Sequence, residues 1–186
     1  MERAVADPRV GASYEADRER WQRRTAGLKR DRRIVLGTFM VVFENAATIA
    51  HALEEALRSD RITDDPAVAA EHRDFEALAP LDRELCGCLY VNARDHAELG
   101  SRLADLAVAR AALYLDVDGS RVEVIGDDDE QLSRPAVCVV RFRLNPEQRR
   151  RLQAGASVTV GIDHPVHRAA ALLTEAQRRA LQDDLG

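Results

Sequence analysis

The sequence has few cysteines and no long apolar segment. Three cysteines among 186 residues are too few, and too odd in number, for a disulfide framework, so we expect free thiols in a reducing compartment. No apolar run approaches the roughly 20 residues that a bilayer span needs, and the first residues lack the apolar stretch of a secretory signal. These absences disfavour a membrane protein and predict a cytoplasmic one.

The motifs of several enzyme classes are also missing. No glycine-rich phosphate loop follows a predicted strand, and no Gly-x-Ser-x-Gly sequence occurs, so nucleotide hydrolysis and serine hydrolysis lack support. The net charge of −5 disfavours a general polyanion binder. Nucleic acid is therefore not an expected partner, and neither is a membrane.

Positive charge is nevertheless concentrated near the N-terminus, and almost all of it is arginine, since Lys29 is the only lysine. In this stretch Tyr14, Trp21 and Leu28 recur at seven-residue steps, as one stripe of a helix would. The pattern predicts an arginine-rich amphipathic helix over residues 12–30 that projects from the domain. Acidic residues dilute its charge, so a protein partner suits it better than nucleic acid.

The rest of the chain alternates between strand-like and helix-like patterns. Strands are predicted at 85–91, 113–116, 121–125, 136–144 and 156–162, with helices between several of them, and residues 33–44 are predicted as one strand or a pair of strands bent at Gly37. Alternation in the strand at 136–144 places Arg141 on the face away from the core, where it could contact solvent or a ligand. The sequence therefore predicts one α+β domain over 1–186, with a mainly antiparallel sheet of about six strands and flanking helices.

The first candidate site lies where the first predicted strand gives way to a helix. Spacings of three and four residues place side chains on one helical face, and carboxylates and an imidazole on such a face can bind a divalent metal ion or transfer protons. The same pattern fits an N-cap followed by a solvated, salt-bridged face, so both interpretations stay open. The residues concerned are Glu44, Asn45, Thr48, His51, Glu55 and Arg58.

The second candidate site is the run Asp163-His164-Pro165-Val166-His167-Arg168, after the last predicted strand. Its side chains could supply metal ligands, a general base or an anion clamp. Alternatively, Asp163 caps the turn before Pro165 and His164 is an ordinary, partly buried histidine. A metal site here would need further ligands from the first candidate site.

Two stretches of the chain share their pattern with other proteins. The first runs from Leu28 to Gly37 and continues through Phe43-Glu44-Asn45-x-x-Thr48 and Glu55-x-Leu57-Arg58. The second contains Arg141-Phe142, Ala154-Gly155-Ala156 and Gly161-Ile162-Asp163-His164-Pro165. Together they resemble a family of uncharacterised bacterial proteins of about this length. The resemblance implies a link to redox or peroxide metabolism, because the family's genes often neighbour those of rubrerythrin and heterodisulfide-reductase-like iron–sulfur proteins; it brings no established activity.

The chain departs from this family pattern at a few positions. Thr38 follows Gly37 where the pattern continues with proline, and His51, His167 and the Cys86-x-Cys88 pair fall outside it. The resemblance therefore supports the two candidate sites but carries a redox role over only as an expectation.

Two functional hypotheses follow from the sequence. The first is an accessory protein that binds a small ligand or a protein partner in a bacterial metabolic or redox pathway, with Asn45, Thr48, Arg58, Arg141 and Arg168 as ligand-binding residues. The alternative is a small enzyme that uses a divalent transition metal. In that enzyme Glu44, Glu55 and His164 would be ligands, while Asp163, His164 and His51 would be the catalytic groups. No complete catalytic set is present, so the sequence leaves open whether the protein is an enzyme.

Overall fold

The computed structural model describes residues 4–81, 83–93, 95–125 and 137–185. The strands in this part of the chain are β1 (Arg33–Leu36), β2 (Phe39–Glu44), β3 (Glu84–Val91), β4 (Leu113–Val117), β5 (Ser120–Ile125), β6 (Val137–Arg143), β7 (Val158–Asp163) and β8 (Arg168–Leu172). The helices are α1 (Ala12–Glu15), α2 (Arg18–Arg30), α3 (Ala46–Ser59), α4 (Asp65–Glu76), α5 (His96–Ala111), α6 (Pro146–Gln153) and α7 (Glu175–Leu185).

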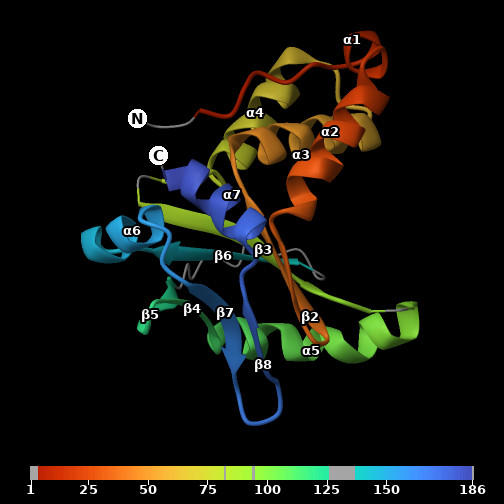
Figure 1. Cartoon of the computed structure of the whole chain (residues 1–186). Helices are drawn as coiled ribbons and strands as arrows, with labels where there is room; N and C mark the ends of the chain where they lie inside the picture. The colour runs from red at the N-terminus through yellow and green to blue at the C-terminus, as the bar shows by residue number, and fades with distance from the viewer. Residues whose placement is uncertain (1–3, 82, 94, 126–136, 186) are drawn as a thin grey trace.

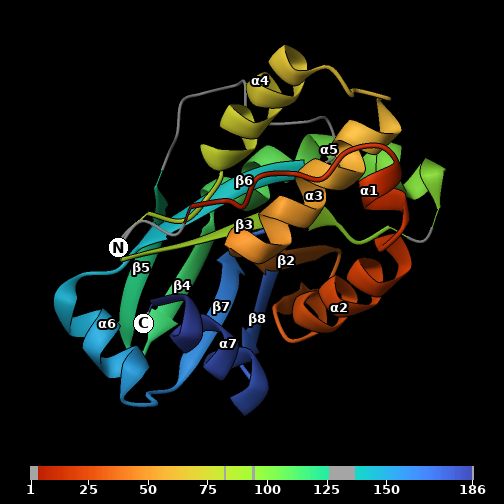
Figure 2. The ribbon, with the colours of Figure 1, turned by 90° about the horizontal axis from the view of Figure 1, so that it is seen from above.

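The strands form one eight-stranded sheet in which every neighbouring pair is antiparallel. Its order is β1-β2-β3-β6-β5-β4-β7-β8. The sheet curls until its two edge strands, β1 and β8, approach each other, so that it is nearly a closed barrel (Figures 1 and 2). Such curling leaves little unpaired edge and encloses one apolar core.

The expectation of a six-stranded sheet was wrong, and two local features explain the difference. Residues 33–44 form two strands, because Gly37 adopts a φ of +67° and allows a tight turn between them. Residues 168–172 form β8, which the sequence did not reveal because its three alanines have a low strand propensity. The antiparallel character of the sheet agrees with the expectation.

The core lies inside the curled sheet. Alternate residues of β2, from Phe39 to Phe43, point inward and are almost completely buried, and Phe142 of β6 lies with its ring centroid 6.0 Å from that of Phe43. Helix α5 adds Leu106 to this core, and α7 adds Leu181. These two helices lie toward opposite ends of β2. Asp105 of α5 pairs with His167, whose ring contacts Phe39 at the start of β2, whereas Asp184 of α7 accepts a hydrogen bond from Asn45, just after the end of β2.

Capping boxes begin two of the helices. Asn45 and Thr48 form a capping box at the start of α3, in which the Asn45 Oδ1 accepts from the Thr48 N–H at 3.1 Å and the Thr48 Oγ1 accepts from the Asn45 N–H at 2.9 Å. Asn145 and Gln148 form the same arrangement at α6. Local side-chain hydrogen bonds therefore fix where these helices begin.

Helices α1 to α4 form a layer on one side of the sheet (Figure 1). The helix predicted over 12–30 is present as two helices, α1 and α2, which are separated at Ala16 and Asp17. Tyr14 of α1 and Thr25 of α2 are buried. Within the described ranges, no helix has the length and apolar character needed to cross a bilayer.

Candidate functional site

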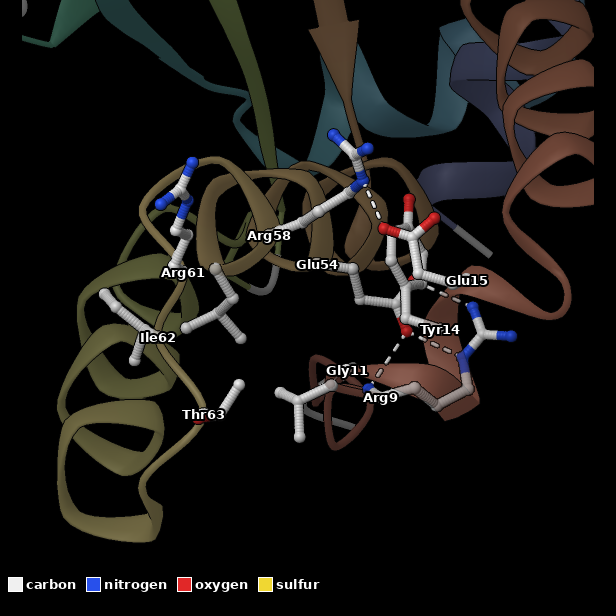
Figure 3. A pocket seen from close by; sticks show the side chains of 11 residues that line it. Arg9, Gly11, Tyr14, Glu15, Glu54, Arg58, Arg61, Ile62 and Thr63 are labelled. Carbon is white, nitrogen blue, oxygen red and sulfur yellow. Dashed lines mark hydrogen bonds and ion pairs between the residues drawn. The ribbon is translucent and has the colours of Figure 1, made fainter.

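A pocket of about 210 Å³ opens between residues 9–15, which we call the N-terminal segment, the last turns of α3 and the loop that follows α3 (Figure 3). Its apolar wall includes Leu57 and Tyr14, which are both buried, and Ile62. Its charged lining consists of three arginines and two glutamates. The pocket thus combines an apolar wall with an excess of one positive charge.

One side of the pocket is held by an ion pair between the N-terminal segment and α3. The Arg9 Nε and Nη2 donate to the two carboxylate oxygens of Glu54, each at 2.8 Å, and the Arg9 backbone N–H donates to Glu54 Oε1 at 3.1 Å. The Arg9 guanidinium also lies 4.5 Å from the ring centroid of Trp21. Because Glu54 is buried, this bidentate pair fixes the N-terminal segment against α3.

The opposite side carries Arg58 and Arg61 at the rim of the pocket (Figure 3). The Arg58 Nε donates to Glu15 Oε1 at 2.6 Å, and both side chains are largely exposed. Arg61 is exposed and, within the described part of the chain, forms no ion pair. In Figure 3 its guanidinium points away from the other lining side chains, so it would have to turn inward to contact an anionic ligand in the pocket.

The backbone at Arg61 has an unusual conformation for this residue type, with a φ of +57°. The Ile62 N–H donates to the Leu57 carbonyl at 2.8 Å, and the Arg61 N–H donates to the Arg58 carbonyl at 3.2 Å. These two bonds form a Schellman motif, whose left-handed position is normally glycine. Arginine at this position lowers the free energy of unfolding by about 1 kcal/mol relative to glycine.

A partly buried polar cluster lies next to the pocket and is centred on Glu55. This carboxylate accepts hydrogen bonds from the Tyr14 hydroxyl at 2.6 Å, from Arg18 at 2.9 and 3.0 Å, and from Gln22 at 3.2 Å. The hydrogen bond from Arg18 is the main reason that the pKa of Glu55 is lowered to about 2, while burial opposes the shift. Glu55 is thus a charged anchor that attaches α1 and α2 to α3.

His51 borders the same cluster. Its Nδ1 lies 3.4 Å from the Tyr14 hydroxyl. Burial lowers the pKa of His51, and the nearby Glu55 carboxylate partly opposes this shift. The imidazole therefore stays neutral at physiological pH, where it contributes packing and a weak polar contact to Tyr14.

Replacing Glu55 with glutamine should lower the free energy of unfolding by about 2 kcal/mol at pH 7. The neutral amide cannot form the charge-assisted hydrogen bonds with Arg18, which are stronger than hydrogen bonds between neutral groups. The folded pKa of about 2 lies below the ordinary 4.5, so this stabilisation is complete above pH 4.5 and is lost as the pH falls toward 2. Urea unfolding at pH 7 and pH 3 measures it, and the difference should be smaller at pH 3. Glu19→Gln, at an exposed pair, should change stability by less than about 0.5 kcal/mol. A difference that persists unchanged at pH 3 would contradict this account.

The remaining residues of the first candidate site have structural partners. Glu44 is buried at the end of β2, where its Oε1 accepts from the Lys29 Nζ at 3.0 Å. Its other oxygen, Oε2, has no hydrogen-bond partner among the described residues. Asn45 and Thr48 form the helix cap described above, and Asn45 also donates to Asp184 at 3.2 Å.

The second candidate site forms the turn between β7 and β8. The Asp163 carboxylate lies 3.3 Å from Arg168 and 3.4 Å from Arg121. His164 stacks on His167, with ring centroids 5.7 Å apart, and its Nδ1 accepts from the Val166 N–H at 3.3 Å. Asp163, Arg121 and Arg168 thus form a small exposed charge network beside this turn, whereas the His167 side chain is largely buried and lies 3.5 Å from Asp105 of α5.

The structure does not bring the two candidate sites together. His167 of the hairpin contacts Phe39 at the start of β2, with ring centroids 5.3 Å apart, whereas Glu44 lies at the other end of that strand. Five residue steps along a strand span about 17 Å. Across the described ranges, no three histidine, cysteine, aspartate or glutamate side chains gather to hold a metal ion. The proposed ligand set of Glu44, Glu55 and His164 is therefore dispersed.

Arg141 is buried and lies two strands away from Glu44 in the same row of the sheet, since Glu44 pairs with Cys86 and Cys86 pairs with Arg141. Its Nη1 donates to the Ala79 carbonyl at 3.1 Å and lies 3.4 Å from Glu84 Oε2, while its Nη2 donates to the Ala77 carbonyl. These bonds attach the end of α4 to β6. A ligand-binding role, as the sequence suggested, would require these bonds to break.

Sequence reasoning found Arg58 but missed Arg9, Glu54 and Arg61 as pocket residues. Arg9 and Glu54 meet only because the chain folds back over 45 residues, and no local pattern encodes that contact. Arg61 did leave a signal in the sequence. The predicted helix ends near Arg58 without any glycine after it, so if this helix ends with a left-handed residue, that residue is not glycine.

Comparisons with known proteins place the chain in a family but give no activity. A family model described as protein of unknown function (DUF3501) matches residues 10–185. A crystal structure of a novel protein of unknown function from Burkholderia pseudomallei is 26% identical, with a TM-score of 0.88 and a match over 100% of both chains. No curated protein matches the chain. The expected association with redox genes stays a prediction, whereas the resemblance itself is confirmed: the chain belongs to the DUF3501 family of proteins of unknown function.

Proposed function

We propose that the protein binds a small organic anion in the pocket between the N-terminal segment and α3. The observation that carries this proposal is Arg61, a strained arginine without an ion pair in the described part of the chain, at the rim of a partly apolar pocket. Strained backbone positions in folded proteins cluster at functional sites, because there the cost is offset by function.

Charge and size indicate the class of ligand. Three arginines and two glutamates line the pocket, and Arg9 and Arg58 are paired with Glu54 and Glu15, which leaves one guanidinium for a single negative charge. A guanidinium binds a carboxylate through two parallel hydrogen bonds. A volume of about 210 Å³ is below the several hundred Å³ typical of drug-sized ligands. A short-chain carboxylate, with its hydrocarbon part against Leu57 and Ile62, fits these limits.

The shape of the pocket is formed before a ligand binds. The bidentate Arg9–Glu54 pair and the cluster around Glu55 hold the N-terminal segment in place on α3. A preorganised site loses little conformational entropy on binding, so even a small ligand can bind measurably.

Arg61→Gly separates binding from stability, because the two should change in opposite directions. Glycine relieves the left-handed strain, so the free energy of unfolding should rise by about 1 kcal/mol. The affinity for carboxylates should fall at least about tenfold, because a charge-assisted bidentate contact is lost. Isothermal titration with acetate, butyrate, hexanoate and succinate measures the affinity, and urea unfolding measures the stability.

Two further variants serve as controls. Arg61→Lys keeps the charge and the strained backbone and should retain part of the affinity. Arg20→Ala removes an exposed charge from α2 outside the pocket and should leave the affinity within about twofold. The proposal fails if none of the four carboxylates binds to the unmodified protein, or if Arg61→Gly binds them as tightly as that protein does.

A further inference from the structure

A second concave surface lies between the C-terminal half of α2 and α7, with a volume of about 530 Å³. The residues that line it include three small ones, Gly27 of α2 and Ala176 and Ala180 of α7. A Cβ atom added at Gly27 would meet no atom within 4 Å, so the space above this residue is open. We call this surface, lined in part by these residues, the α2–α7 groove.

The walls of the α2–α7 groove are basic. Four arginines and two aspartates line it. Arg24 stacks on the Trp21 ring, with its guanidinium carbon 4.9 Å from a ring centroid, and pairs with no acidic residue in the described ranges. Arg30 and Arg179 form only exposed pairs with neighbours on their own segments, which are worth about 0–1 kcal/mol each. An acidic partner could therefore replace those pairs at little cost.

The fourth arginine, Arg32, fixes the shape of the groove. It is 4% exposed and donates to both carboxylate oxygens of Asp184, which lies at the end of α7. Its Nη2 also donates to the Ala180 carbonyl at 3.3 Å. These bonds hold α7 against the corner between α2 and β1, so the two walls keep a constant separation.

Charge and openness favour a peptide over a compact ligand. The groove is open to solvent, whereas sites for small molecules enclose most of the ligand surface. Arg24 and Arg30 lie about 9 Å apart along the axis of α2, and because six residues turn a helix through about 600° their side chains leave it in different directions. A ligand that contacts both arginines must therefore extend over this surface. We propose that the α2–α7 groove docks an extended acidic segment of a partner protein, with small apolar residues over Gly27.

Fluorescence anisotropy with three labelled probes tests this proposal on the full-length protein. The first probe is a twelve-residue peptide of four Glu-Pro-Ala repeats, the second carries glutamine in place of glutamate, and the third is an oligothymidylate of the same charge. The glutamate peptide should bind saturably at low salt and more tightly than either of the others. Preference for the oligothymidylate would assign the groove to nucleic acid and overturn the proposal, as would equal binding of the glutamine peptide or no binding of the glutamate peptide.

Two double variants of equal charge show whether the groove is the site. Arg24→Glu with Arg179→Glu reverses charge inside the groove, and Arg20→Glu with Arg23→Glu reverses the same charge elsewhere on α2. We expect at least a tenfold loss of affinity for the groove variant and less than a threefold loss for the other. Arg24→Gln with Arg179→Gln, which only neutralises the groove charge, should give an intermediate loss. Equal losses of affinity in the two charge-reversal variants would show that binding depends on the overall charge of the protein and not on the groove, and would overturn the proposal.

Discussion

Arg32→Met should lower the free energy of unfolding by about 3–5 kcal/mol, the largest effect expected for a single substitution in this protein. The Arg32 and Asp184 side chains are 5% and 3% exposed, so the pair lies in a region of low dielectric constant. Methionine fills a similar volume but leaves the Asp184 carboxylate buried without the guanidinium charge. Urea unfolding at pH 7 measures the loss.

A double variant distinguishes the cost of an uncompensated charge from a general loss of packing. Arg32→Met combined with Asp184→Leu removes both charges, so it should recover at least about half of the lost stability. Arg30→Met, at an exposed pair with Asp31, should change stability by less than about 0.5 kcal/mol. If the double variant is no more stable than Arg32→Met, the buried charge is not the cause.

Arg141→Met should lower the free energy of unfolding by about 3 kcal/mol and leave carboxylate binding unchanged. Its guanidinium bonds to two backbone carbonyls at the end of α4 and to Glu84, which is 2% exposed, so its removal leaves several buried acceptors unsatisfied. Urea unfolding and the titration described for Arg61 measure the two quantities.

Arg143→Met provides the matched comparison for Arg141. Arg143 also donates to Glu84, at 2.6 Å, but its side chain is 64% exposed, so we expect a loss of about 1 kcal/mol or less. A fall in carboxylate affinity in Arg141→Met, with stability unchanged, would restore the ligand-binding role that the sequence suggested.

The candidate site was partly predictable. The three- and four-residue spacing on α3 correctly placed His51, Glu55 and Arg58 on related faces of one helix, because helical geometry determines it. The groups that face them could not be predicted in the same way. Tyr14 meets Glu55 across 41 residues, and that contact depends on how α1 packs on α3.

The separation of the two predicted clusters also depended on tertiary structure. Both Glu44 and Asp163 end strands, and the sequence does not state which end of the sheet each strand end reaches. In the antiparallel sheet these two strands place them at different ends, since the turn that follows Asp163 contacts Phe39 through His167. A metal site that joined the clusters was therefore plausible only before the strand order was known.

The sequence by itself determined the local features of this protein. Asn45 and Asn145 begin their helices, and Asp118 and Gly119 turn the hairpin between β4 and β5. These features depend on hydrogen bonds and periodicities that act over four residues or fewer. Only the tertiary structure decided that the sheet curls, that Arg32 meets Asp184 across 152 residues, and that Arg61 lines a pocket. Those outcomes follow from burying apolar faces and pairing buried charges, which depend on residues far apart in the chain.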